Sequence, residues 1–234
     1  GYSLVEVLSP CPTNWKVTPK DSFTYLEEKM EKEYPIGVMK DMTAKKKKKG
    51  AQVMLQKTIM SGIGGQGILF SGKCFAWAAM LEGRHVTYLP AYGAEMRGGV
   101  TSCTIAISDE EIASPVASSP DYLVVMDNLS LERLQNQSAS GGEIFINTSI
   151  VTGRPVRGDI EVVELPVNDL AKASVGERYA NMIMLGAFVT KTRQVKLSTI
   201  IDNMEEMLGK SKARFKDKNI EALHVGCDFF AKEK

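Results

Sequence analysis

The sequence KTIMSGIGGQG, at Lys57–Gly67, joins an apolar segment to a glycine-rich turn, and Ile68–Met80 continues it as a helical segment. Gly62, Gly64 and Gly67 have the spacing G-x-G-x-x-G. At a strand-to-helix junction, the first glycine permits a tight turn, the second lets backbone approach a ligand, and the third lets the helix pack close to the strand. The helix would point its free N–H groups and its positive dipole end at the turn. The stretch therefore predicts a strand, a turn suited to an anion and a helix.

Nicotinamide binding would require a further feature. In dinucleotide-binding folds an acidic residue near the end of the second strand holds a ribose hydroxyl. Here the second predicted strand, His85–Leu89, runs into Pro90-Ala91-Tyr92 without a carboxylate, and Glu95 follows later in a loop. The glycine spacing alone is a weak signal. A free-standing nicotinamide or flavin oxidoreductase is therefore the alternative interpretation of this region.

A second glycine motif follows that strand. The segment PAYGAEMRGG, at Pro90–Gly99, has the pattern P-x-YG-x-E-x-RGG. Together with G-x-GGQG at 62–67, it resembles the gamma subunit or gamma domain of the 2-oxoacid:ferredoxin oxidoreductases, which act on pyruvate, 2-oxoglutarate, branched-chain oxoacids or indolepyruvate. The resemblance covers about residues 57 to 230. Weaker matches extend it through Ser108–Ile112, Ser114-Pro115, Asp121–Asp127, Gly141-Gly142, Asn181, Leu185-Gly186, Asn219, Ala222 and Gly226.

The resemblance implies a role in a larger complex. Such complexes oxidatively decarboxylate a 2-oxoacid to its acyl-CoA and pass electrons to ferredoxin. Thiamine diphosphate, Mg²⁺ and iron–sulfur clusters are expected in partner subunits only. The expected partners are alpha and beta subunits, with a ferredoxin-like delta subunit as a further candidate. The gamma domain would be non-catalytic, supporting assembly and contacting coenzyme A (CoA). The particular 2-oxoacid is not specified by these motifs.

Candidate binding residues come from the two glycine motifs, whose segments we expect at the carboxyl ends of neighbouring strands, where open α/β sheets bind ligands. They are Gly62, Gly64, Gly65, Gln66, Gly67, Tyr92, Glu95 and Arg97. The glycine turn could cradle a phosphate, or it could be a structural turn that docks a partner subunit. Arg97 could grip a phosphate or carboxylate, or it could pair with Glu95 or a neighbouring subunit. No catalytic residue or metal site is expected, since the two histidines lack metal-ligand spacing.

The first 41 residues have a different pattern. We expect a strand over Tyr2–Leu8 and a helix capped by Thr18, with Pro19 at its first position and Pro35 at its end. One strand and one helix cannot bury a core of their own, so we expect this piece to pack on the gamma domain or on a second copy of the chain, or else to be mobile.

A resemblance names this N-terminal piece. VEVLSPCPTNW, at Val5–Trp15, is similar to the C-terminal end of the beta subunit of the same oxidoreductases. The Gly-Asp-Gly segment by which that subunit binds thiamine diphosphate is absent from this sequence. We therefore expect a beta-subunit tail over residues 1–41, a linker over 42–56 and the gamma domain over 57–234. Either a shortened natural beta–gamma fusion or an excised piece of one would have this order.

The linker contains five consecutive lysines, Lys45–Lys49. Like charges repel one another and favour a solvated, extended segment. A basic patch for an acidic partner such as ferredoxin is the alternative.

Composition sets further limits. The chain has 234 residues, of which 44% are hydrophobic and 24% charged, and its net charge of +1 gives no global attraction to nucleic acid or membranes. No apolar run reaches the length of a membrane span. Four cysteines lie far apart without a C-x-x-C motif, which argues against an iron–sulfur cluster held by this chain and favours buried free thiols in a reducing cytoplasm. A homodimer is compatible with these properties.

Hydrophobic periodicity outlines the remaining elements. Strands alternate with helices, which predicts an α/β fold: a Rossmann-like three-layer sandwich with a mainly parallel sheet, plus a small N-terminal strand–helix extension. Strands are expected at Val100–Ile107, Asp121–Met126, Glu143–Asn147 and Ile160–Leu165. Helices are expected at Leu129–Gln137, at Tyr179–Thr190, along a stripe from Leu197 to Leu208 that begins near Ser198 and ends near Gly209, and along a last stripe from Ile220 to Cys227.

Overall fold

The structure is a computed structural model that describes residues 15–33, 54–93 and 99–231. The chain divides into two compact units, Gly1–Gln52 and Val53–Lys234. The predicted strand over Tyr2–Leu8 and the lysine run lie outside the described residues, as do Glu95 and Arg97.

In the N-terminal unit the structure describes a helical segment over residues 21–33. It comprises α2 (Asp21–Tyr25), a π-helical turn (Leu26–Met30) and α3 (Glu31–Glu33). The hydroxyl oxygen of Thr18 accepts a hydrogen bond from the Asp21 amide at 3.2 Å, so Thr18 supports the helix start as expected, although the regular helix begins two residues after Pro19. Within this segment, Phe23 is 62% exposed.

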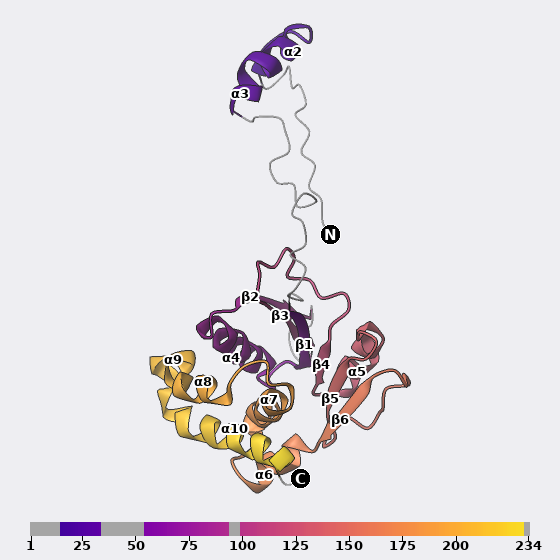
Figure 1. Cartoon of the computed structure of the whole chain (residues 1–234), viewed down its shortest axis with the longest axis vertical. Helices are drawn as coiled ribbons and strands as arrows, with labels where there is room; N and C mark the ends of the chain where they lie inside the picture. The colour runs from indigo at the N-terminus through magenta and orange to yellow at the C-terminus, as the bar shows by residue number, and fades with distance from the viewer. Residues whose placement is uncertain (1–14, 34–53, 94–98, 232–234) are drawn as a thin grey trace. The chain divides into compact units, whose positions relative to one another are not determined.

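The second unit is built on a six-stranded sheet in the order β2-β3-β1-β4-β5-β6 (Figure 1). β1 pairs in parallel with β4, β4 with β5, and β5 with β6, whereas β3 lies antiparallel to both β1 and β2. Five strands therefore share one direction, and the expected α/β fold with a mainly parallel sheet is confirmed. The strands are β1 (Leu55–Ile63), β2 (His85–Tyr92), β3 (Val100–Ser108), β4 (Tyr122–Val125), β5 (Glu143–Asn147) and β6 (Glu161–Leu165).

The sheet has an apolar core on each face, because successive side chains of a strand point to opposite sides. Met60 of β1 belongs to the larger core and its neighbour Ile59 to the smaller one. In Figure 1, α5 lies on the side of the sheet opposite α4 and α7. The larger core receives side chains from α4 (Ile68–Leu81), α6 (Val167–Ala173), α7 (Ala180–Thr192), α8 (Leu197–Asp202), α9 (Met204–Leu208) and α10 (Lys216–Ala231), and the smaller one from α5 (Asn128–Leu134).

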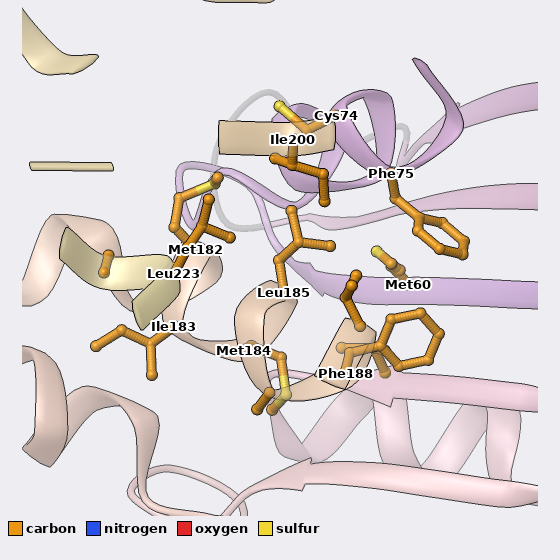
Figure 2. Close-up of a cluster of buried hydrophobic side chains, with 14 of the residues drawn as sticks. Met60, Cys74, Phe75, Met182, Ile183, Met184, Leu185, Phe188, Ile200 and Leu223 are labelled. Carbon is orange, nitrogen blue, oxygen red and sulfur yellow. The ribbon is translucent and has the colours of Figure 1, made fainter. Parts of the chain in front are cut away.

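Helix α7 is the centre of the larger core. Every residue from Ala180 to Val189 is buried, and all of them except Asn181 are apolar or glycine. Phe188 packs edge-on against Phe75 of α4, with ring centroids 5.2 Å apart (Figure 2). It packs in the same way against Phe145 of β5, at 5.0 Å. Such edge-to-face contacts add to the stabilisation from buried area. α7 thus connects α4, the helix that follows the glycine turn, to β5 of the sheet.

Two sequence-based boundaries are wrong. β2 does not end at Leu89 but continues through Pro90 to Tyr92. A proline has no N–H for the ladder, yet β2 is an edge strand, where one side of the backbone needs no partner. The helix expected from Leu197 to Leu208 is divided at Asn203, whose side-chain amide donates to the Thr199 carbonyl at 2.8 Å and so offers that carbonyl an alternative to the helical bond.

Two smaller differences concern the start of α8 and the presence of α6. α8 begins after Lys196 without a side-chain cap, so the expected capping near Ser198 is not found. α6 was not expected, because its seven residues are too few for a clear periodic pattern.

Candidate functional site

The sheet has a topological switch point between β1 and β4. These strands are parallel neighbours, and α4 follows β1 on one face while α5 follows β4 on the other. In open α/β sheets the crevice outside such carboxyl ends is where ligands bind. At this edge of the sheet the glycine turn follows β1, and Asp127 and Asn128 follow β4.

The glycine turn needs its glycines for different reasons. A Cβ at Gly62 would lie 2.5 Å from the Gln66 side-chain oxygen and 2.8 Å from Ile68. Gly65 has φ +101°, a backbone conformation that L side chains rarely adopt. Gly67 has φ +77°, and a Cβ there would lie 2.7 Å from the amide nitrogen of Asn181. The sequence motif therefore specifies a left-handed turn packed closely on both sides.

The side chain of Gln66 folds back over this turn. Its Oε1 accepts from the Ile63 amide at 2.8 Å, and its Nε2 donates to the Met126 carbonyl in a longer contact of 3.4 Å. Gln66 therefore links the end of β1 to the end of β4 across the switch point. Its polar atoms are engaged within the chain, which makes it a residue that positions the turn.

Only some backbone amides of the turn are free. The Gly64 amide donates to the Gly99 carbonyl at 3.0 Å, and the Gln66 amide donates to the Ile63 carbonyl at 3.1 Å. Within the described part of the chain, no hydrogen bond is donated by the amides of Gly65, Gly67, Ile68 and Leu69. These donors lie at the start of α4, where the helix dipole favours negative charge. Gly64 and Gly65 are exposed, so an anion can reach the turn from solvent.

The side chain of Asn181, at the start of α7, is hydrogen-bonded to the glycine turn. Its Nδ2 donates to the Gly67 carbonyl at 3.0 Å, although 114 residues separate the two in sequence. The Gly67 carbonyl also accepts from the Phe70 and Ser71 amides, both at 3.1 Å. Asn181 lines a small apolar cavity beneath the first turn of α4 together with Met126. The family resemblance includes Asn181 among its weaker matches, but sequence reasoning gave it no role.

The start of α5, which follows β4 at the switch point, is held by a buried polar network that sequence reasoning missed. Asp127 is 2% exposed, and its carboxylate accepts from the Ser130 amide at 3.0 Å and from the Ser130 hydroxyl at 2.6 Å. The hydroxyls of Ser130 and Ser61 are 2.8 Å apart, which connects α5 to β1. Asp127 is thus the N-cap of α5. Asn128 lies next to it and holds Thr152 through its side-chain oxygen.

The last residue of the second glycine motif, Gly99, contacts the glycine turn. Tyr92 is the last residue of β2 and is 74% exposed, while Gly99 accepts the Gly64 amide. Tyr92 lies near Tyr88: burial, followed by the neighbouring Cys103 and Tyr92, raises the pKa of the Tyr88 hydroxyl. Tyr88 donates to the Leu69 carbonyl at 3.0 Å, in the first turn of α4. The structure therefore brings the ends of both motifs to the same helix start.

The buried cysteines carry no reactive thiol. Burial raises the pKa of Cys74 and of Cys103 to about 12, so both stay protonated and poorly nucleophilic at neutral pH. Among the residues that the structure describes, no group of three or more His, Cys, Asp or Glu side chains could hold a metal ion. Over the same residues, no helix has the length and apolar character that a membrane crossing requires.

Fold and site define an α/β domain with a glycine turn at a topological switch point of its sheet. The chain belongs to the pyruvate ferredoxin/flavodoxin oxidoreductase family, whose model matches residues 57–229. This range contains both glycine motifs and nearly all of the second unit. The sequence resemblance is thereby confirmed, and the alternative of a free-standing nicotinamide or flavin oxidoreductase is not favoured.

Curated relatives extend the similarity. Ketoisovalerate oxidoreductase subunit VorA of Methanothermobacter thermautotrophicus is 33% identical over 217 residues, which cover 81% of this chain and 45% of the relative. VorA of Methanothermobacter marburgensis is 30% identical over 268 residues, which cover 99% of this chain and 54% of the relative. The chain therefore spans about half the length of these relatives, and the second match includes its N-terminal unit.

Solved structures agree on the fold. The gamma subunit of a keto/oxoacid ferredoxin oxidoreductase from Geobacter sulfurreducens matches 74% of this chain and 96% of its own, with 25% identity and a TM-score of 0.63. The 2-oxoglutarate:ferredoxin oxidoreductase of Magnetococcus marinus matches 77% of this chain and 32% of its own, with 17% identity and a TM-score of 0.64. That enzyme was solved with 2-oxoglutarate, coenzyme A and succinyl-CoA bound.

Proposed function

We propose that residues 57–234 are the gamma component of a 2-oxoacid:ferredoxin oxidoreductase, a complex that oxidatively decarboxylates a 2-oxoacid to its acyl-CoA. The observation that carries this proposal is the family match over residues 57–229, which includes both glycine motifs. Thiamine diphosphate with Mg²⁺ and iron–sulfur clusters would supply the bond-breaking and electron-transfer chemistry from partner subunits. The partners would be alpha and beta subunits, with ferredoxin as electron acceptor of the complex.

The chain's own share would be to hold the phosphates of CoA. The unpartnered amides of Gly65, Gly67, Ile68 and Leu69 would donate to phosphate oxygens, and the positive end of α4 would favour their charge. The switch-point position supports the same assignment. This role requires no proton transfer and no nucleophile from the chain, which fits the protonated state of Cys74 and Cys103.

The N-terminal unit would be the end of a thiamine-binding beta subunit that continues into the gamma domain. The VorA match over 99% of the chain supports this arrangement, because it runs from the N-terminal unit into the gamma domain in one relative. We place the complex in the reducing cytoplasm, consistent with the buried thiols of the second unit.

A substitution at Gly65 tests CoA binding. Its Cβ would meet no atom within 4 Å, so Gly65→Asp adds a carboxylate at the anion site without a steric collision. Gly65→Asn adds a neutral side chain of the same shape and the same backbone strain. In the assembled complex, we expect Gly65→Asp to raise the KM for CoA at least tenfold above that of Gly65→Asn, with the KM for the 2-oxoacid unchanged. Equal CoA kinetics in the two variants would contradict a phosphate site at the turn.

Arg97 provides a second test, which follows from the motif alone. Arg97→Ala would remove a charge-assisted hydrogen bond, a loss of about 1.5–3 kcal/mol. This corresponds to a rise of roughly 10- to 150-fold in the KM for CoA when binding limits it. Assays with 2-oxoisovalerate, pyruvate and 2-oxoglutarate would identify the oxoacid in the same experiment. If subunit association fails while CoA kinetics stay normal, the glycine motifs form an interface and not a ligand site.

A further inference from the structure

Helix α4 exposes an apolar stripe on its outer side. Met80 is 56% and Leu81 47% exposed, and Phe70 and Trp77 are only partly buried. With Lys73 they recur every three or four residues and therefore share one face of the helix. These five residues are called the α4 stripe. A helix with apolar residues on all sides is normally covered on all sides.

Neighbouring elements hold α4 on either side of the stripe and leave it open. On the β2 side, the Tyr88 hydroxyl donates to the Leu69 carbonyl at 3.0 Å. On the α8 side, the Glu82 carboxylate accepts from the Lys196 amide at 2.8 Å and from the Thr199 hydroxyl at 2.7 Å. α4 is therefore fixed in place, and its exposed stripe is a preformed surface. In Figure 1, α4 lies beside β2, and α8 and α9 lie close to α4 as well.

Lys73 is the one charged residue in the sequence of α4, ILFSGKCFAWAAML. Its Nζ lies 5.2 Å from the centroid of the Trp77 ring, and within the described residues no carboxylate pairs with it. A partner that covers the stripe would remove this ammonium group from water. Burying an unpaired charge is costly, whereas an opposing carboxylate offsets the loss of hydration. The stripe thus specifies a chemistry for its occupant.

We propose that the α4 stripe is the docking surface for another subunit of the complex, which contributes an apolar surface with an acidic side chain opposite Lys73. The inference rests on the proposed function only in assuming a multi-subunit complex. Aromatic and methionine side chains are enriched in such interfaces. A second copy docked stripe to stripe fits less well, because it would bring two lysines together without a carboxylate on either α4 helix. A bilayer fits less well, since a single lysine adds little attraction to anionic lipid.

Charge reversal and a charged substitution test the stripe in the full-length chain, co-expressed with its partner subunits. We expect Lys73→Glu and Met80→Asp each to weaken subunit association at least tenfold in sedimentation velocity. Two matched changes at exposed positions outside the stripe, Lys212→Glu and Val156→Asp, should stay within twofold of wild type. The melting temperature of each purified variant shows whether the gamma domain folds. If Met80→Asp does not fold, Lys73→Glu carries the test.

Zero-length carbodiimide cross-linking identifies the occupant, because it joins a lysine amine only to a carboxylate in direct contact. A bond from Lys73 to an acidic residue of another subunit would support the proposal. A bond to a second copy of this chain, or association unchanged in both stripe variants, would overturn it. Association does not report on catalysis: a complex that assembles through the stripe and oxidises no 2-oxoacid would contradict the proposed function alone.

Discussion

At the scale of single residues, the glycine turn is held by side chains that point into the protein. Gln66 bonds to Ile63 and Met126, and Asn181 bonds to the Gly67 carbonyl. Neither side chain is available as a flexible ligand group. What faces solvent is backbone, and backbone amides at a helix start can bind any phosphate of suitable reach. Selectivity for CoA would then come from residues that contact the rest of the ligand.

Removing the Gln66 side chain separates a positioning role from direct ligand contact. Gln66→Ala leaves the Ile63 amide without its acceptor, so we expect the unliganded chain to lose about 0.5–1.5 kcal/mol of unfolding free energy. The KM for CoA in the complex should rise while that for the 2-oxoacid does not. Chemical denaturation of the isolated chain measures the first effect. Gln137→Ala, at an exposed position, is the control and should change stability by less than about 0.5 kcal/mol.

Glu143 makes stability depend on pH in an unusual direction. Burial, and then the like charge of Glu161 opposite it on β6, raises the pKa of Glu143 above its ordinary value of 4.5, while Lys191 partly offsets this. A raised pKa in the folded state means that the folded protein binds the proton more tightly than the unfolded chain. The contribution to stability is therefore complete below the ordinary value and is lost as the pH rises through the raised value.

We expect Glu143→Gln to raise the melting temperature at pH 7, because glutamine keeps the shape of the side chain and removes the unfavourable charge. The advantage over wild type should shrink as the pH falls below the raised pKa, where wild-type Glu143 is itself neutral. Melting curves between pH 3.5 and 8 measure the difference. An advantage that grows towards acid pH would show that the assigned direction of the pKa shift is wrong.

At the scale of elements, the crossing of α7 and α10 explains two of the weaker sequence matches. A Cβ at Gly186 of α7 would overlap the backbone of Leu223, and a Cβ at Gly226 of α10 would overlap the backbone of Ile183. The two helices therefore pack backbone to backbone at these glycines. This close contact sets the position of α7, which in turn presents Asn181 to the glycine turn.

Gly226→Ala should accordingly force the two helices apart. Overpacking a core typically costs about 1–3 kcal/mol, and here the obstacle is backbone, which cannot move aside as a side chain can. We expect the melting temperature to fall by roughly 2–4 °C for each kcal/mol lost. Gly158→Ala is the control, since its Cβ would meet no atom within 4 Å. Equal melting temperatures for the two variants would mean that the helices do not cross at Gly226.

At the scale of the whole molecule, the function proposed for this chain is to bind and to assemble, while partner subunits would supply the chemistry of the complex. The second unit offers backbone donors at the switch point and an open stripe on α4. Neither feature transfers a proton or an electron.

The isolated chain should therefore have no oxidoreductase activity. We expect no turnover of pyruvate, 2-oxoglutarate or 2-oxoisovalerate when a viologen dye accepts electrons, with or without added thiamine diphosphate, Mg²⁺ and CoA. The complete complex, assayed in parallel, is the positive control. Dye reduction by the purified chain would show that it has a catalytic centre of its own.

The sequence alone was sufficient for the local elements and the family. The glycine spacing predicts the turn between β1 and α4, and the hydrophobic pattern predicts the strand at Asp121–Met126 and the helix at Tyr179–Thr190. These features depend on residues within one turn or one strand, so their pattern is visible without neighbours. The motif pair also indicated the family, which the match over residues 57–229 confirms.

Only the tertiary structure decided which backbone groups of the turn stay free. β3 lies between β1 and β2, so the end of β2 is not the direct neighbour of the glycine turn that a simple strand–helix–strand unit would give. The Gly99 carbonyl accepts a hydrogen bond from the Gly64 amide. The side chain of Asn181, 114 residues away in sequence, donates to the Gly67 carbonyl. The period of a strand determines which side chains face the core, but not which strand lies beside it, because pairing depends on groups distant in sequence. The site is therefore a product of strand order and helix packing, to which the motif contributes a turn with the required shape.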